Sequence, residues 1–97
     1  MTIEKQIDGN TAVLCLKGWM DTHGAPAFAE ALEGLEPEVD SLVLDLTDLE
    51  YTSSAGLRLF VTAHKKMKGG LTIKNASAEV MDVFNMSGFS KKLHIET

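Results

Sequence analysis

The sequence predicts a single α/β domain with a mixed, mostly parallel sheet and three helices. Two patterns indicate this fold class: short apolar runs typical of strands alternate with longer segments of helical periodicity, and Asp8-Gly9-Asn10 is a hairpin turn signal. The 97 residues, 44% of them hydrophobic, suffice for one compact core, so we expect one domain over residues 1–97. The expected order is β-β-α-β-α-β-α-β, with the N-terminal β-hairpin supplying an antiparallel edge.

The first two predicted strands flank this turn. Thr2–Ile7 alternates weakly between apolar and polar residues, and Thr11–Lys17 alternates clearly. Cys15 is the only cysteine, which excludes a disulfide within the chain. We expect it to be a buried strand residue, because a free cysteine packs as a small hydrophobe. One face of the second strand carries Ala12, Leu14 and Leu16, and the other carries Val13 and Cys15.

A first helix is predicted after the hairpin. Asp21 or Thr22 can cap this helix, and Pro26 is tolerated in its first turn. Gly34 and Pro37 close it. Its apolar stripe consists of Phe28, Ala31, Leu32 and Leu35.

The central strand and the second helix come next. Ser41–Leu46 is nearly all apolar, which fits a short strand covered on both faces. Thr47–Glu50 is expected to be a polar connection. The second helix is expected over about 54–68, where Gly69 and Gly70 stop it.

Two more strands and a third helix complete the predicted fold. The strands are Leu71–Lys74 and Leu93–Glu96. Ser77 can cap the helix between them, and Gly88 follows its last turn. The apolar residues of this helix are Val80, Met81, Val83 and Phe84.

A hydroxyl cluster, Thr52, Ser53 and Ser54, lies where the chain enters the second helix. In sheets of this kind, ligand and partner sites gather where strands end and helices begin. Ser54 is expected at the N-cap, and most such serines only cap. The position also suits a phosphate, because a helix N-terminus tolerates an anion and a phosphoserine carries roughly -1.5 to -2 charges. Both interpretations stay open at this point.

Leu57 and Val61 lie outside the apolar stripe that should face the sheet, and their spacing of four puts them on one flank of the helix. Either they pack under a neighbouring helix, or they form an exposed apolar strip beside the serines, which would mark a protein interface. In the second case, a phosphate on Ser54 would oppose docking of an apolar partner while the fold stays intact. The stripe itself consists of Gly56, Leu59, Phe60, Ala63 and Met67.

Composition and motifs argue against several classes of function. The 14 acidic residues outnumber the 9 Lys and Arg residues, so neither nucleic acid nor an anionic membrane is an expected partner. The sequence shows no apolar run that could cross a bilayer and no leader-like start, so we expect a cytoplasmic protein or the cytoplasmic part of a larger one. The histidines are far apart and no phosphate-binding loop occurs, so we expect neither a metal nor a cofactor.

Enzymatic catalysis is a competing class of function. Ser54 could be a nucleophile with a histidine as its base. However, the G-x-S-x-G elbow is absent, and nothing supplies an ordered acid for a histidine. We therefore expect no enzymatic activity. The candidate bases are His23, His64 and His94.

Three segments resemble the STAS domains, and within them the bacterial anti-sigma factor antagonists. LVLDLTDLEYTSSAGLRLF at 42–60 is similar to the family's signature of an apolar strand, an acidic connection and a D/S-S-x-G-L turn into a helix. GWMDTHGAPAFAEAL at 18–32 resembles the G-x-hydrophobic-Asp segment and first helix of the family. MSGFSKKLHI at 86–95 resembles its closing Gly-aromatic segment and last strand. Their order and spacing imply a single STAS-like domain over nearly the whole chain.

The resemblance implies a phosphorylation switch. In the family, a serine kinase that doubles as the anti-sigma factor phosphorylates a Ser of the signature turn, and a PP2C-type phosphatase removes the phosphate. Alignment on the Gly-Leu of the motif puts the acceptor at Ser54, with Ser53 as the alternative where many members have Asp. Asp21 matches an Asp that lies near the phosphorylation loop in the family. The expected partner-binding residues are Asp21, Thr22, Thr52, Ser53, Ser54, Leu57 and Val61.

The resemblance also leaves an alternative role open. STAS domains occur as accessory subunits of transport or stress-sensing complexes. The length and the S-S-A-G-L turn favour an anti-sigma factor antagonist, whose unphosphorylated form binds the kinase and releases its sigma factor or an equivalent target. We expect a monomer that associates with its partners on demand.

Overall fold

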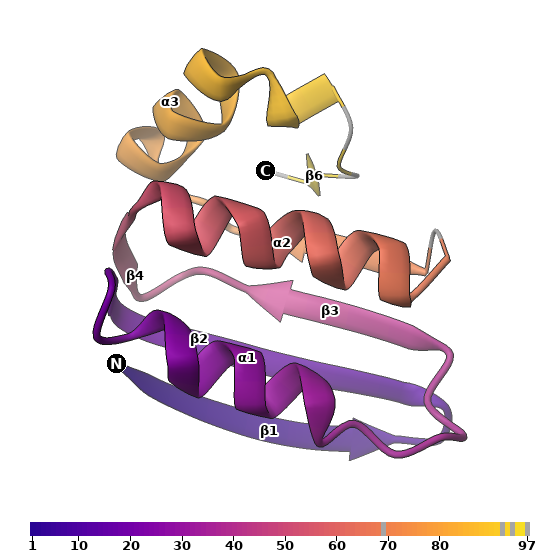
Figure 1. Cartoon of the computed structure of the whole chain (residues 1–97). Coiled ribbons are helices and arrows are strands. Elements are labelled where there is room, and N and C mark those ends of the chain that lie inside the picture. The colour runs from indigo at the N-terminus through magenta and orange to yellow at the C-terminus, as the bar shows by residue number, and fades with distance from the viewer. Residues whose placement is uncertain (69, 92, 94, 97) are drawn as a thin grey trace.

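The computed structural model describes residues 1–68, 70–91, 93 and 95–96. These residues form three α-helices, a short 3-10 helix and a sheet of six strands (Figure 1). In chain order the elements are β1 (Thr2–Asp8), β2 (Thr11–Met20), α1 (Ala25–Glu33), β3 (Ser41–Asp45), β4 (Leu49–Thr52), α2 (Ser54–Lys66), β5 (Leu71–Lys74), α3 (Ala78–Ser87), η1 (Phe89–Lys91) and β6 (Ile95–Glu96).

The sheet is mixed and mostly parallel, as predicted. Its strand order is β1-β2-β3-β5-β6, and among the strand pairs of the described residues only β1–β2 is antiparallel. The predicted hairpin turn is confirmed: Asp8 pairs with Thr11, and Gly9 adopts a positive φ of 62°. Glycine adopts this left-handed conformation without steric cost, which explains its place in a two-residue turn.

Strand β4 was not predicted, and the expectation of a polar connection over Thr47–Glu50 is wrong. β2 is ten residues long, and β3 pairs only with its first half. The second half of β2 leaves a free edge, where β4 pairs in parallel. Leu49 and Thr52 are buried there, whereas Glu50 is exposed at a register shift. Burial of two side chains at this edge favours a strand although polar residues surround them in the sequence.

The core lies on one face of the sheet, beneath α1 and α2 (Figure 1). Phe28 of α1, Phe60 of α2 and Phe84 of α3 form a chain of ring contacts, with both centroid distances at 5.3 Å. This chain joins the three helices over the sheet. The strand residues beneath them are Ala12, Leu14, Leu16, Leu42, Leu44, Leu71 and Ile73.

The expectation that Ser41–Leu46 is covered on both faces is wrong for the described residues. Leu42 and Leu44 are buried, but Val43 between them is only half-buried. Cys15, its diagonal neighbour on β2, is also half-buried and not buried as expected. The helices cover one face, so an apolar run in the sequence corresponds here to a strand with one open face.

Helix ends agree with the sequence for α3 and differ for α2. The Ser77 hydroxyl accepts the N–H of Val80 at 3.2 Å, and Gly88 ends α3 with φ 78°, as predicted. α2 ends at Lys66, two residues before the expected end, and Gly69 lies outside the described residues. β6 covers only the second half of the strand expected over 93–96, which includes His94 outside the described residues.

Candidate functional site

Ser53, not Ser54, is the N-cap of α2. Ser53 has extended backbone angles, and its hydroxyl accepts the N–H of Gly56 at 3.4 Å. Ser54 is the first helical residue and is exposed. Capping by a side chain requires an N–H two or three residues later, which Ser53 has within reach in Gly56. Among the described residues the Ser54 hydroxyl makes no hydrogen bond, so its chemistry is independent of the cap.

The turn before α2 is held against the end of β2. The N–H of Ser53 donates to the carbonyl oxygen of Met20 at 2.8 Å. A Cβ at Gly56 would collide with the Met20 side chain and with the Thr52 hydroxyl, so this position accepts only glycine without rearrangement. Thr52 is 1% exposed and donates its hydroxyl to the carbonyl oxygen of Ser53 at 3.3 Å. Thr52 therefore supports the turn from below and does not present its side chain to a partner.

Leu57 and Val61 do not form one exposed strip. Leu57 is buried at 5% exposure and belongs to the core, so the interpretation as an exposed apolar strip is wrong for Leu57. Val61 is half-buried. Leu57 forms part of the floor of an apolar groove between the start of α2 and α3, of about 370 Å³. Its other lining residues are Tyr51, Thr52, Ser53, Ser54, Val83, Met86 and Ser87.

Asp21 closes the turn before α1 but does not cap the helix. Its carboxylate accepts the N–H of Gly24 at 2.8 Å and the N–H of His23 at 3.0 Å. The N-cap position belongs to Gly24, which makes no side-chain cap, so the expected capping role of Asp21 or Thr22 is wrong. The hydrogen bond from Gly24 is the main reason why the pKa of Asp21 lies below its usual range.

The sheet brings the two predicted site segments together. Met20 pairs with Thr52 in the β2–β4 ladder, so Asp21 and Ser53 each follow directly after a paired residue. A second groove lies between α1 and α2, and the exposed Arg58 is one of its lining residues. Ser54 thus stands between a groove on the α3 side and another on the α1 side. The residues of this second groove are Thr22, Ala25, Pro26, Ala29, Ala55, Arg58 and Leu59.

Sequence reasoning missed an aromatic pair beside the serines. Trp19 is 55% exposed and Tyr51 39% exposed, and their ring centroids lie 5.1 Å apart. The two residues pair across β2 and β4, on the face opposite to that of buried Met20 and Thr52. The alternation in the second strand contained a signal. Leu14 and Leu16 face inward, and Trp19 lies an odd number of residues after both, so it faces outward.

The described residues give no support to a metal site or a serine nucleophile. No group of three His, Cys, Asp or Glu residues among them could hold a metal ion. No hydrogen bond in the described part of the chain joins Ser54 to a histidine, and the candidate base His94 lies outside it. None of the described helices combines the length and the apolar character needed to cross a membrane.

Comparison with known proteins identifies the family. The STAS domain family model matches residues 2–97. The chain belongs to the STAS domain family. This STAS domain is 38% identical over 97 residues to BtrV of Bordetella bronchiseptica, which is named as an anti-sigma factor antagonist; the match covers 92% of this chain and 78% of BtrV.

Solved structures of low sequence identity share the fold. An anti-sigma factor antagonist from Mycobacterium paratuberculosis superposes with a TM-score of 0.87 at 21% identity, over 97% of this chain and 83% of that one. The anti-sigma factor antagonist SpoIIAA in its unphosphorylated form gives 0.80 at 20% identity, over 99% and 89% of the two chains. SpoIIAA of Bacillus in its phosphorylated form gives 0.69 at 19% identity, over 99% and 92%.

Proposed function

We propose that this STAS domain is an anti-sigma factor antagonist that works as a phosphorylation-switched binding module. It binds a serine-kinase anti-sigma factor while Ser54 is unphosphorylated and thereby releases a sigma factor or an equivalent target. The observation that carries the proposal is the position of Ser54, which is exposed, the first residue of α2 and not engaged in the cap. The names of its relatives support the same role.

Ser54 suits the acceptor role better than Ser53. The Ser53 hydroxyl accepts the N–H of Gly56, so a phosphate there would have to replace the cap. Loss of a serine N-cap costs about 0.5–2 kcal/mol. Ser54 carries no such role, and the first turn of α2 contains no acidic residue that would repel a phosphate. A phosphate on Ser54 therefore leaves the fold in place.

A phosphate on Ser54 would still prevent docking. The groove beside it is lined largely by apolar atoms of Tyr51, Leu57, Val83 and Met86. A partner that covers this groove removes water from the Ser54 side chain. The desolvation of a doubly charged phosphate opposes that contact. The modification changes the surface without changing the core.

The partners of such a switch would be the kinase and a PP2C-type phosphatase that restores the unmodified form. The domain itself would act by binding, in the cytoplasm, with no cofactor and no catalysis. Asp21, Thr22 and Val61 would lie at the edge of the partner surface, and Thr52 and Leu57 would shape it from below.

The test is an affinity capture from a lysate of the source organism with three baits: the wild type, Ser54→Asp and Ser54→Ala. We expect an ATPase of the serine-kinase type on the wild type and on Ser54→Ala, and its loss from Ser54→Asp. Ser54→Ala is the control for removal of the hydroxyl without added charge. The same kinase on all three baits would overturn the switch, and transporter subunits in place of a kinase would favour the accessory role.

A further inference from the structure

The aromatic pair Trp19–Tyr51 is an unusual feature of this surface. Trp19 is the only tryptophan of the chain, and more than half of its surface is exposed. Its side chain gains no core packing in return, although large aromatic residues usually bury most of their area. Exposed aromatic residues that lie next to a groove are typical of the centre of a protein interface.

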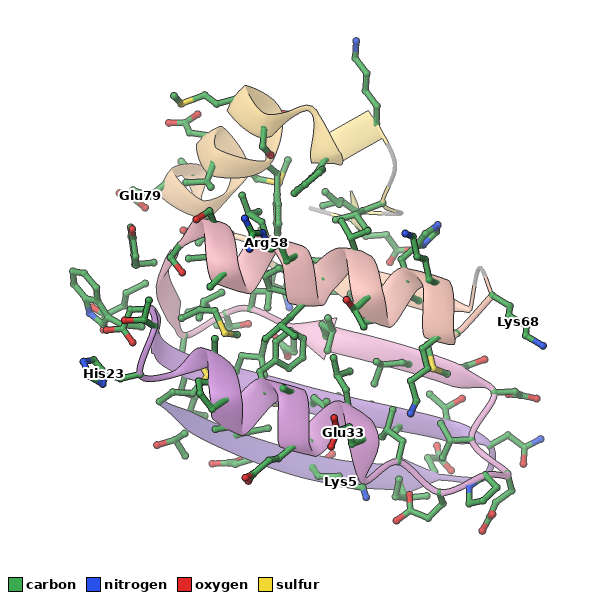
Figure 2. The ribbon with its side chains drawn as sticks, viewed as in Figure 1. Lys5, His23, Glu33, Arg58, Lys68 and Glu79 are labelled. Carbon is green, nitrogen blue, oxygen red and sulfur yellow. The ribbon has the colours of Figure 1, made fainter. Side chains whose placement is uncertain are left out.

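An acidic groove adjoins Trp19. It has a volume of about 610 Å³ and runs from the connection after β3 to the start of α3. Three exposed carboxylates line it: Asp48, Glu50 and Glu79. Figure 2 shows Glu79 at the start of α3, on the edge of the molecule where β4 lies in Figure 1.

No cation of the described chain neutralises these carboxylates by a direct ion pair. The ion pairs among the described residues are Lys5–Glu36 and Lys17–Glu4, and neither involves the groove. The register shift between β2 and β4 places Glu50 outside the ladder, beside the paired Trp19 and Tyr51. Lys17, which forms an ion pair with Glu4, also attracts Asp48 electrostatically. A groove with an indole on its wall and three carboxylates, none of them in a direct ion pair among the described residues, still offers complementary charge to a cation.

We propose that this groove binds a basic segment of the partner protein, with an arginine side chain lying over Trp19. A guanidinium group fits this surface better than an ammonium group, because it is planar, weakly hydrated and stacks on aromatic rings. The carboxylates accept its N–H groups from the side. The inference rests on the proposed function, since Tyr51 joins this groove to the one that contains Ser53 and Ser54.

The geometry gives the partner a direction of approach. The partner's apolar contact falls on the groove beside Ser54, and its basic segment extends across Tyr51 to Trp19 and the carboxylates. The acidic groove also speeds the encounter with a basic partner at low ionic strength. Its contribution therefore weakens as the salt concentration rises.

The test is an NMR titration of the 97-residue protein with a defined probe. The probe is the peptide acetyl-Arg-Gly-Arg-Gly-Arg-Gly-amide, and peptides with Lys or Glu in place of Arg serve for comparison. We expect saturable shifts of the Trp19 indole N–H and of the backbone amides of Asp48, Glu50 and Glu79, with the Arg peptide binding most tightly and the Glu peptide not at all.

Variants distinguish a specific contact with the Trp19 indole from general attraction between opposite charges. Trp19→Leu keeps an apolar side chain but removes the ring, and we expect it to weaken binding of the Arg peptide by roughly threefold or more. Trp19→Phe, which keeps an aromatic ring, should weaken binding of the Arg peptide less than Trp19→Leu does. Glu50→Gln combined with Glu79→Gln should weaken binding at least as much as Trp19→Leu. The matched control is Glu30→Gln combined with Glu33→Gln on α1, which makes the same change of charge outside the groove.

Three outcomes would overturn the inference: equal weakening by the control pair, shifts that do not centre on Trp19, or concentration-dependent self-association that covers the groove with a second copy. A different result would contradict the proposed switch at Ser54. Ser54→Asp should bind the peptide within about twofold of the wild type, because its charge lies outside the groove and is screened. A kinase captured equally by wild type and Ser54→Asp would contradict the switch while the peptide result stands.

Discussion

At the scale of single residues, the site depends on which of two adjacent serines caps α2. Ser53 donates its N–H to the carbonyl oxygen of Met20, and its hydroxyl accepts the N–H of Gly56. Its backbone and its side chain therefore both stabilise the turn. Ser54 is exposed and has no such role in the described structure. The sequence pattern predicts the cap at Ser54, one residue too late, because the β4 ladder sets where the helix begins. A shift of one residue changes the interpretation from a cap to a modifiable surface hydroxyl.

The two serines should differ in their contribution to stability. We expect Ser53→Ala to lower the free energy of unfolding by about 0.5–2 kcal/mol, because the N–H of Gly56 loses its acceptor. Ser54→Ala should change it by less than about 0.5 kcal/mol. Urea unfolding followed by circular dichroism measures both. A larger loss of stability for Ser54→Ala than for Ser53→Ala would show that Ser53 is not the residue that caps α2.

Asp21 should make stability depend on pH. Hydrogen bonds from Gly24 and His23 hold its pKa in the folded state below the usual value of 3.8. The ionised Asp21 therefore makes its full contribution to the free energy of unfolding above the unfolded-state pKa. This contribution is lost as the pH falls through the lower, folded-state pKa. We expect Asp21→Asn to be less stable than the wild type at neutral pH, and the difference to shrink on acidification below 3.8.

The measurement is urea unfolding of both proteins between neutral pH and the acid limit of folding. Asp82→Asn on α3, an exposed carboxylate outside this turn, serves as the control. A difference between Asp21→Asn and the wild type that stays constant over the whole range would contradict the proposed role of the two N–H donors.

At the scale of secondary-structure elements, the strand–helix order could be predicted because each element has its own local signal. Asp8-Gly9-Asn10 predicted the hairpin, and Ser77 with Gly88 predicted both ends of α3. Strand β4 had no such signal, because it forms where β2 extends beyond β3 and leaves an edge. The alternation along β2 indicates that Trp19 faces outward, but its contact with Tyr51 depends on the pairing of β2 with β4 and could not be predicted from the strand alone. Pairing between distant segments thus explains most of what the sequence did not reveal.

The contact between α2 and the strands beneath it should tolerate no side chain at Gly56. A methyl group there meets the Met20 side chain and the Thr52 hydroxyl, and overpacking of this kind costs about 1–3 kcal/mol. We expect Gly56→Ala to be destabilised by that amount in urea unfolding, despite the higher helix propensity of alanine. Gly34→Ala at the end of α1, where the nearest atom is less close, is the comparison and should lose less. Equal stability of Gly56→Ala and the wild type would contradict the close approach.

Arg58 lies one helical turn after Ser54 on α2 and forms no ion pair among the described residues. Side chains four apart on a helix are neighbours, so a phosphate on Ser54 would have a guanidinium within reach. In protein carrying phosphoserine at position 54, we expect the second pKa of the phosphate to be roughly 0.2–0.4 higher in Arg58→Gln than in the wild type. Phosphorus NMR against pH measures it. Lys65→Gln, farther along α2, should leave it unchanged, and an equal change in both variants would exclude a specific pair.

At the scale of the whole molecule, the core and the candidate site occupy different places. The core lies beneath α1 and α2, and the chain of Phe28, Phe60 and Phe84 joins the three helices (Figure 1). The candidate site lies at one edge, where the ends of β2 and β4 meet the start of α2. A negative charge on Ser54 would lie on an exposed residue outside the buried core. This separation allows binding to change while the fold is kept.

Ser54→Asp should therefore separate binding from stability. We expect its free energy of unfolding to stay within about 0.5 kcal/mol of the wild type, because an acidic residue in the first turn of a helix is favourable. Its affinity for the kinase captured by the wild type should fall by at least roughly tenfold, since the partner must desolvate the new charge. Urea unfolding and calorimetric titration on the same preparation give both values. Loss of binding together with a large loss of stability would mean that Ser54 belongs to the fold, and unchanged binding would mean that the partner docks elsewhere.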